Sequence, residues 1–313
     1  MHRLVHNANW TESKNIFELD GPIPRLFNQD LDIDAWRKER DEALNSLTYN
    51  TLKEMLQATG SQTGISDNVS HKLFIIRRKD PVDVGSHAVV SVASRNVKEK
   101  LRKRAIKMEK SQLFDLYATT SVAPFTMRVA GVFYEGYCFK HIANNGIHLK
   151  LLKMVRLRDS EELEKKSRFR SSHCQIENSE LEKERQKVIS QPETVDIAGG
   201  DLCVKYYDNP DGNAQLEENT LYIPETSNEK SLDAFFMHKS CLYILQFTIA
   251  EEHSVKPVDD FFSRYTGCPS SNNWKFVFII DGFHTLRVPY KNYAFTLYST
   301  IMKPEDGGLM SLR

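Results

Sequence analysis

The fold is indicated most clearly by two stretches, Leu232-Asp-Ala-Phe-Phe236 and Cys241-Leu-Tyr-Ile-Leu-Gln-Phe-Thr248. Both are short and rich in residues that favour strands, and few residues separate them. They therefore predict two strands over 231–238 and 240–250 that can form a hairpin. One polar side chain interrupts each apolar run, Asp233 in the first and Gln246 in the second. A buried polar side chain is costly unless it has partners, so these two residues mark a candidate site.

Around this pair, predicted helices and strands alternate as in an α/β protein. Residues 127–144 form an apolar helix that carries Glu135, and 274–281 is a continuous apolar run typical of a buried central strand. A proline opens a further predicted helix over 257–265. The predicted order in the second half is helix, strand, strand, strand, helix, strand. The other predicted strands cover 148–157, 202–207 and 220–224.

The first part of the chain has a different pattern. Apolar residues recur at helical spacing over 31–59 and 97–117, and two short strands are predicted at 72–77 and 88–92. We expect two domains: a mostly helical region, 1–122, and an α/β domain, 123–313. Residues 159–192 are polar and rich in both charges, which predicts a partly helical surface insertion in the second domain.

Composition excludes several classes of protein. The 313 residues contain 42 basic and 42 acidic side chains, so the chain as a whole lacks the excess of basic charge that marks many nucleic-acid-binding proteins. Five widely spaced cysteines without a C-x-x-C pair argue against a disulfide framework or a structural zinc, and favour buried thiols. No stretch approaches the roughly 20 apolar residues of a membrane helix, so no membrane partner is expected.

Charge is nevertheless locally uneven. The run 98–107 has six basic residues and one acid, and 150–158 is also basic. A solvated helix face is the simplest interpretation of 98–107; the alternatives are a phosphate-facing patch or a nuclear import signal. Any DNA-facing site should then be a confined basic surface beside Asp233.

Oxygen-bearing side chains on two neighbouring strands and one helix suit a hard divalent cation. Mg²⁺ needs one or two carboxylates and keeps several waters, so Asp233 with Glu135 or Gln246 would suffice. Simpler roles also exist. Glu135 could pair with Arg128 or Lys140 on its own helix, and Gln246 could bind irregular backbone. Asp233 could cap a neighbouring strand, a role we rank below a site role because apolar residues flank it.

The order of elements resembles the PD-(D/E)XK restriction-endonuclease-like fold, and more closely the nuclease-like part of Crinkler and retrotransposon-hot-spot proteins of fungi, oomycetes and trypanosomatids. The blocks that carry the resemblance are Ala130-Gly-Val-Phe-Tyr-Glu135 with His141, Leu232-Asp-Ala-Phe235, and Leu245-Gln-Phe-Thr248 followed by His253. Three earlier blocks resemble the last third of the NTPase module in those proteins: Gly21-Pro-Ile-Pro-Arg25, His71-Lys-Leu-Phe-Ile-Ile-Arg-Arg78 and Leu113-Phe-Asp-Leu-Tyr117.

The sequence departs from that family pattern at two points. No G-x-x-x-x-G-K-[ST] motif occurs, since Gly60-Ser-Gln-Thr-Gly64 is followed by Ile65, so no ATP site is assigned and the NTPase module looks shortened at its start. The nuclease lysine is replaced by Thr248, and Gln246 stands in place of an acid. Lys239 or Lys256 could supply the charge as a phosphate contact.

The resemblance implies an effector-like protein with a Mg²⁺-dependent nuclease or DNA-binding domain that acts on DNA phosphodiesters. It would work inside a cell or its nucleus, and host proteins would be further partners if it is an effector. Asp233, Gln246 and Glu135 would be the catalytic and metal-binding residues. The alternative is a catalytically inactive interaction module of the same architecture. A plain NTPase is disfavoured by the missing phosphate loop.

Overall fold

The computed structural model describes residues 10–21, 32–60, 70–78, 88–122, 126–157, 168–170, 192–207, 214–225, 232–283, 286–289 and 293–304. The chain divides into two compact units, Met1–Gly136 and Tyr137–Arg313. The division falls inside helix α7 (Met127–Asn145), and not at residue 122 where the sequence changes character. Helices and strands are mixed, which confirms the predicted α/β class at that level.

The first unit contains most of the helices. Where the sequence predicts one helix over 31–59 and one over 97–117, the structure has two helices each time. Leu47 and Met108 end the earlier helix of each pair with extended backbone. In each pair, both helices bury apolar residues, so the apolar spacing continues across the break. The periodicity of the sequence therefore does not reveal either break. The helices are α1 (Trp10–Asp20), α2 (Ile33–Ser46), α3 (Tyr49–Gly60), α4 (Ser70–Leu73), α5 (Arg95–Lys107) and α6 (Lys110–Ser121).

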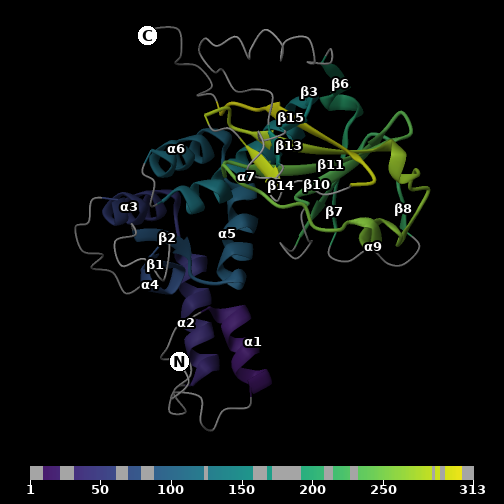
Figure 1. Ribbon diagram of the computed structural model, residues 1–313. Helices are drawn as coiled ribbons and strands as arrows, with labels where there is room; N and C mark the ends of the chain where they lie inside the picture. The colour runs from purple at the N-terminus through teal and green to yellow at the C-terminus, as the bar shows by residue number, and fades with distance from the viewer. Residues whose placement is uncertain are drawn as a thin grey trace, which may run out of the picture. The chain divides into compact units, whose positions relative to one another are not determined.

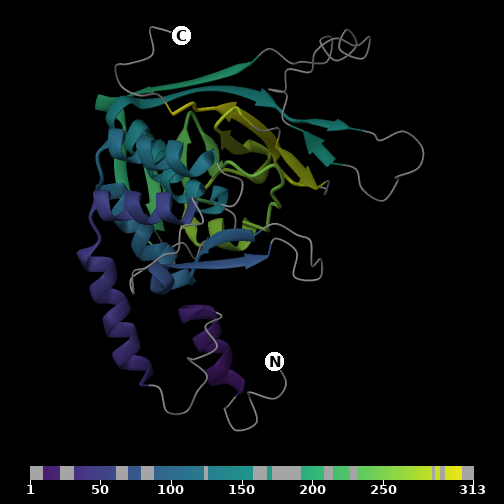
Figure 2. The same ribbon diagram turned by 90° about the vertical axis from the view of Figure 1, so that its left-hand side faces the viewer.

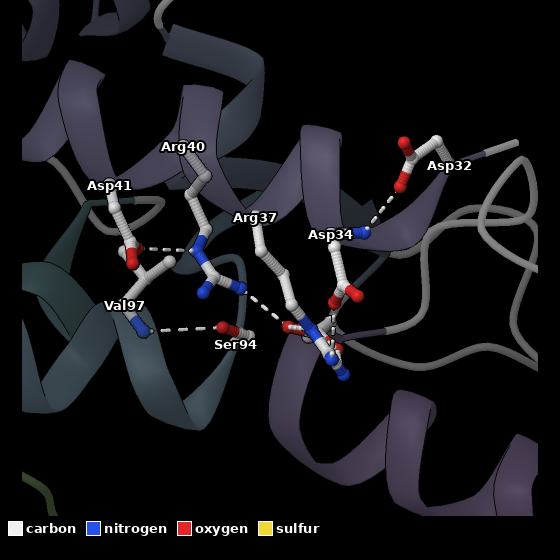
Figure 3. A network of polar contacts seen from close by, with 8 residues as sticks. Asp32, Asp34, Arg37, Arg40, Asp41, Ser94 and Val97 are labelled. Carbon is white, nitrogen blue, oxygen red and sulfur yellow. Dashed lines mark hydrogen bonds and ion pairs between the residues drawn. The ribbon is translucent and has the colours of Figure 1, made fainter.

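A buried carboxylate joins two of these helices. Asp20, at the end of α1, is fully buried and accepts hydrogen bonds from Arg37 at 2.6 Å and Arg40 at 2.5 Å on α2. Arg40 also donates to Asp41 (Figure 3). Asp41 pairs in turn with Lys100 of α5. Asp20 and Arg40 are thus buried as an ion pair, because an unpaired charge would be costly to desolvate. Of the block 21–25, only the first residue lies within the described part of the chain.

Strands β1 (Phe74–Arg78) and β2 (Ala88–Val92) form an antiparallel pair, the two blue strands of Figure 2. Their predicted positions are confirmed within two residues. Phe74, Val89 and Val90 are buried, whereas Ile76, on the same face of its strand as Phe74, is exposed, so the pair is buried only in part in the first unit. A two-stranded sheet needs such packing to be stable.

The second unit is built on one eight-stranded sheet, shown in Figure 1. Its three middle strands are mutually parallel, and antiparallel strands flank them on both sides. The hairpin predicted from 231–250 is confirmed. In spatial order the strands are β6 (Glu193–Ala198), β3 (Gly146–Lys153), β15 (Thr296–Ile301), β13 (Trp274–Ile280), β11 (Cys241–Thr248), β10 (Ala234–His238), β9 (Thr220–Pro224) and β7 (Cys203–Tyr207).

Both faces of the middle strands are covered, which explains their continuous apolar sequence. On one face, Phe139 of α7 packs edge to face against Phe247 of β11, with ring centroids 4.9 Å apart. On the other face, Phe262 of α9 (Asp259–Phe262) packs against Phe235 of β10 at 5.1 Å. Side chains alternate along a strand, so Gln246, next to Phe247, points to the α9 face.

Three predicted elements differ from the structure. The strand over 148–157 is interrupted at Met154, which is buried and donates its backbone N–H to Leu297, and then continues as β4 (Val155–Leu157). The helix over 257–265 is only the single turn α9, closed by the Ser263 hydroxyl on the Asp260 carbonyl. Within the described residues, seven strands (β3 to β9) lie between α7 and β10, and four of them belong to the eight-stranded sheet, so the short predicted order is embedded in a larger sheet.

The remaining elements are small. Strand β14 (Arg287–Pro289) pairs with β5 (Arg168–Arg170), which also pairs with β4, and β8 (Ala214–Gln215) pairs with β12 (Tyr265–Thr266). Short 3-10 helices cover Gly199–Asp201 and Ser271–Asn273. Apart from β5 and residue 192, the predicted insertion 159–192 lies outside the described residues. Of the described cysteines, all are free thiols, but only Cys138 is buried.

Candidate functional site

Asp233 and Gln246 lie directly opposite each other at one end of the β10–β11 pair. The register pairs Ala234 with Leu245, and Asp233 continues it by donating its backbone N–H to the Leu245 carbonyl at 2.9 Å. The Gln246 side-chain amide donates to Asp233 Oδ2. Gln246 is buried and Asp233 is half-buried. The structure therefore brings together the two residues that the sequence selected as interruptions of apolar strands.

Asp233 also completes the ladder of β11. Its Oδ2 accepts the Phe247 backbone N–H at 2.8 Å, in the place where β10 no longer supplies a carbonyl. This is the capping role that sequence analysis ranked below a site role, and the structure shows it. Apolar neighbours reveal burial but not where a strand begins, so the sequence could not show the capping contact, and a site role for Asp233 stays a prediction.

The same edge of the sheet gathers further polar side chains. Asp233 and Gln246 lie near the carboxyl ends of the parallel strands, the edge at which open α/β sheets bind ligands. Register places Gln246 beside Phe278 and Thr248 beside Ile280. The ring of His253 packs against Phe278, with centroids 5.7 Å apart. His253 therefore lies on the same face as Gln246, a proximity that its distance along the chain does not reveal.

Thr248 occupies the position at which the nuclease pattern has lysine. Its hydroxyl oxygen accepts the Ala250 backbone N–H at 3.1 Å, and the side chain is buried. The residue thus closes the end of β11 as a local turn. It carries no charge that could orient a phosphate.

Asp281 follows β13 immediately and is 1% exposed. Its Oδ1 accepts the Phe283 backbone N–H at 3.0 Å, and Gly282 between them has a φ of 85°. Asp281 and Gly282 thus form a turn directly after the strand. The buried carboxylate has a structural role in holding this turn at the carboxyl edge.

Glu135 is placed differently from the sequence expectation. It lies in the first unit, is 7% exposed, and accepts a hydrogen bond from the guanidinium of Arg102 on α5. The ion pair neutralises a carboxylate that would otherwise be costly to bury. The partner is neither Arg128 nor Lys140, the alternatives considered from the sequence. Periodicity could not find a partner 33 positions away on another helix.

The two candidate lysines have unequal positions. Lys239 forms the tight turn between β10 and β11, at the opposite end of the hairpin from Asp233. The five residues of β10 lie between them, and the six steps along the strand span about 20 Å, so Lys239 cannot contact a phosphate held at Asp233. Lys256 is exposed on the segment that leaves the carboxyl end of β11, which is the correct edge.

Cations follow each of the three parallel strands at this edge. Lys256 follows β11, Arg287 follows β13 and Lys303 follows β15, and all three are exposed. Acidic side chains are also exposed nearby, including Glu251 and Glu252 directly after β11. The edge is therefore mixed in charge, with one cationic side chain on each exit segment.

Some basic side chains of the run 98–107 form contacts inside the first unit. Arg102 pairs with Glu135, Lys100 pairs with Asp41 at 2.6 Å, and Arg104 donates to the Leu44 carbonyl at 3.1 Å. The side chains at 98, 103 and 107 are exposed. Half of the run's cations therefore stabilise the packing of α5, so the run is a weaker patch than its composition indicates.

A second polar cluster lies at the opposite end of the middle strands. The Glu193 carboxylate pairs with Lys275 and accepts the Tyr243 hydroxyl at 3.3 Å. Burial raises the pKa of the Tyr243 and Tyr298 phenols, and nearby Glu193 raises both further. The phenols therefore remain protonated donors, and the cluster stabilises the sheet through its own contacts.

Within the described residues, no three side chains of His, Cys, Asp or Glu come together in a geometry that could hold a metal ion. A site at this edge must therefore use an amide oxygen and water beside a single carboxylate. None of the helices described is long and apolar enough to span a bilayer. Comparisons of the chain with protein-family models, with curated proteins and with solved structures give no match.

Proposed function

We propose that the second unit is a PD-(D/E)XK-like nuclease domain that uses Mg²⁺ to act on DNA phosphodiesters at Asp233 and Gln246. The observation that carries the proposal is the pairing of these two oxygen-bearing side chains across β10 and β11. Mg²⁺ prefers such hard ligands and needs only one or two of them from protein. The edge of the sheet is also the one at which open α/β sheets bind ligands.

The donor set fits a cation if the Gln246 amide turns over. Its nitrogen now donates to Asp233 Oδ2. Rotation of the amide by half a turn would present its oxygen to the same point, and the Phe247 N–H would keep Asp233 in place. When bound there, Mg²⁺ would polarise a phosphodiester and lower the pKa of the attacking water. Asp233 is the principal ligand of the proposal and Gln246 the second.

Glu135 lies in the first unit, where Arg102 neutralises it, so the proposal for the second unit rests on Asp233 and Gln246. Lys256 would contact phosphate from the segment after β11. Neither Thr248 nor Lys239 can replace the lysine of the nuclease pattern, so slow turnover is expected.

Plasmid cleavage tests the proposal. Purified protein with Mg²⁺ or Mn²⁺ should nick supercoiled DNA, and Asp233→Asn should abolish nicking while the fold is retained. Asp201→Asn, which neutralises an exposed carboxylate elsewhere in the second unit, is the matched control and should cut normally. Equal activity of wild type and Asp233→Asn, or no nicking by either, would refute a nuclease site at Asp233.

Specific observations favour a second candidate, an inactive interaction module of this architecture. Asp233 caps a strand, Thr248 binds local backbone, and Glu135 is neutralised. An effector role inside a host cell or its nucleus, with DNA or host proteins as partners, follows from the resemblance alone. Metal-independent DNA binding without cleavage would support this candidate.

A further inference from the structure

Phe283 is an exposed aromatic side chain at the same edge of the sheet as Asp233 and Gln246. It is 70% exposed. Among the phenylalanines whose side chains the structure describes, it alone is exposed. Burial of a phenylalanine side chain stabilises a protein, so an exposed one forgoes that stabilisation. Such a residue at a candidate site suggests a binding role.

The fold holds Phe283 outward. Asp281 before it is 1% exposed and binds the Phe283 backbone N–H, whereas Leu286 after it is fully buried. Both ends of the short connection are therefore anchored in the core. Gly282 has a φ of 85°, which favours glycine, and an added Cβ would lie 3.0 Å from the Ile301 side chain. The turn is thus built for a backbone path that places residue 283 at the surface.

A cationic side chain lies next to this turn. The Cβ that Gly282 lacks would stand 3.4 Å from Cε of Lys303, and Lys303 is exposed. The Lys303 side chain therefore passes close to the residue that precedes Phe283, at the ends of β13 and β15. The pair of Phe283 and Lys303 suits a nucleotide with an unstacked base, because the ring can stack on the base while the ammonium contacts a phosphate.

The position relative to Gln246 connects this pair to the candidate site. Gln246 is in register with Phe278, and Thr248 is in register with Ile280, one residue before Asp281. Only a short stretch of the carboxyl edge separates the turn from Asp233 and Gln246. A strand of nucleic acid lying along the edge could contact both.

We infer that the substrate class at this edge is single-stranded or locally unpaired nucleic acid, with Phe283 as the stacking platform for a base and Lys303 as the phosphate contact. The inference deepens the proposed function and rests on it for the identity of the ligand. A paired duplex would bind less well, because its bases are already stacked and do not expose a face to the ring.

Binding without cleavage tests the inference. Fluorescence anisotropy of a labelled twelve-nucleotide oligo(dT) and of a duplex of equal length, both in EDTA, gives the two affinities. Wild type should prefer the single strand. Phe283→Ala should weaken single-strand binding about tenfold, and Phe283→Trp should restore it. Tyr206→Ala removes an exposed aromatic from β7, four strands from β13, and is the matched control that should bind normally.

Several outcomes would overturn the inference: equal binding by Phe283→Ala and wild type, a preference for duplex, or no binding by wild type at all, as a surface for a protein partner would give. Binding that depends on Phe283 while no variant nicks DNA with Mg²⁺ would support the inference and refute the nuclease. If Asp233→Asn abolishes nicking while Phe283→Ala leaves single-strand binding unchanged, the nuclease is supported and the inference about Phe283 is refuted.

Discussion

Asp233 Oδ2 accepts two hydrogen bonds, one from the Gln246 amide and one from the Phe247 backbone N–H. At the scale of the residue, this carboxylate therefore has a structural role whatever its part in chemistry. Any test of activity that removes the whole side chain would confuse the two roles. An amide of the same shape keeps one oxygen for the backbone and removes the charge.

We predict that Asp233→Ala lowers the free energy of unfolding by about 1 to 3 kcal/mol, because a backbone N–H next to a buried amide loses its acceptor. Asp233→Asn should lose less than half of that amount, since its carbonyl oxygen can still accept the Phe247 N–H. Urea denaturation followed by circular dichroism measures both. Identical losses for the two substitutions would show that Asp233 does not cap β11.

The Arg102–Glu135 pair gives a second prediction at this scale. Both side chains are buried, so Glu135→Gln leaves an uncompensated buried guanidinium and should cost about 3 to 5 kcal/mol of stability. Replacing both residues, as in Arg102→Met with Glu135→Leu, should recover most of the loss. Chemical denaturation of the three proteins is the measurement. A single substitution without effect would mean that the carboxylate is not paired as described.

At the scale of elements, the β10–β11 turn uses residues that its backbone does not favour. Lys239 and Ser240 have φ values of 50° and 58°. Turns of this kind favour Asn-Gly or Gly-Gly. Glu218 compensates by accepting the backbone N–H groups of both residues, at 3.0 and 3.1 Å.

Ser240→Gly should therefore stabilise the protein by roughly 0.5 to 1 kcal/mol, because glycine adopts the positive φ without strain. Ser240→Ala is the matched control: it removes the hydroxyl but keeps the Cβ, and should give no gain. A thermal melt compares them. Equal melting temperatures for the glycine variant and wild type would contradict the account of this turn.

His238 gives the hairpin a pH dependence. Its Nδ1 lies 2.7 Å from Oδ1 of Asn219, and burial lowers its pKa, with neighbouring Lys239 lowering it further. The unfolded chain then binds the proton at higher pH than the folded one. The contribution of His238 to stability is complete above its ordinary pKa of about 6.5 and is lost as pH falls through the lowered folded pKa.

Denaturation at pH 7.5 and at pH 5.5 should therefore show a larger loss of stability for wild type than for His238→Gln. His238→Gln is the control for wild type, because it removes this one titrating group and leaves the others unchanged. A wild-type loss equal to that of the variant would mean that the folded state does not disfavour the histidinium ion.

Some helices and strands can be predicted from the sequence alone, and others cannot. Runs with a continuous or alternating apolar pattern, such as 274–280 and 88–92, have the predicted strand positions. Features set by contacts distant along the chain were not predictable: the break at Leu47, the interruption at Met154, and the reduction of 257–265 to one turn. For the site, Asp233 and Gln246 were found because polar interruptions are visible, whereas the Arg102 partner and the His253 contact require the folded chain.

At the scale of the whole molecule, the equal numbers of acidic and basic residues conceal a division of roles. Cations in 98–107 are partly paired within the first unit, whereas one exposed cation follows each parallel strand in the second. DNA binding should then have a weak salt dependence. We predict a slope of log K against log salt of about −2 for single strands, which corresponds to about three phosphate contacts.

Two triple variants test this prediction. Serine at positions 98, 103 and 107 should leave the affinity and the slope unchanged. Serine at positions 256, 287 and 303 should lower the affinity and reduce the slope to near zero. A salt titration of anisotropy measures both quantities, and the opposite assignment of effects would place the DNA-facing surface in the first unit.

The proposed divalent-cation site at the carboxyl edge of the sheet consists of Asp233 and Gln246. Titration of the protein with Mn²⁺, followed by electron paramagnetic resonance, measures bound cation directly. We predict one bound Mn²⁺ for wild type and for Asp201→Asn, tighter binding for Gln246→Glu, and loss of the bound ion in Asp233→Asn. Equal binding by wild type and Asp233→Asn, or no bound Mn²⁺ in wild type, would contradict the proposed site.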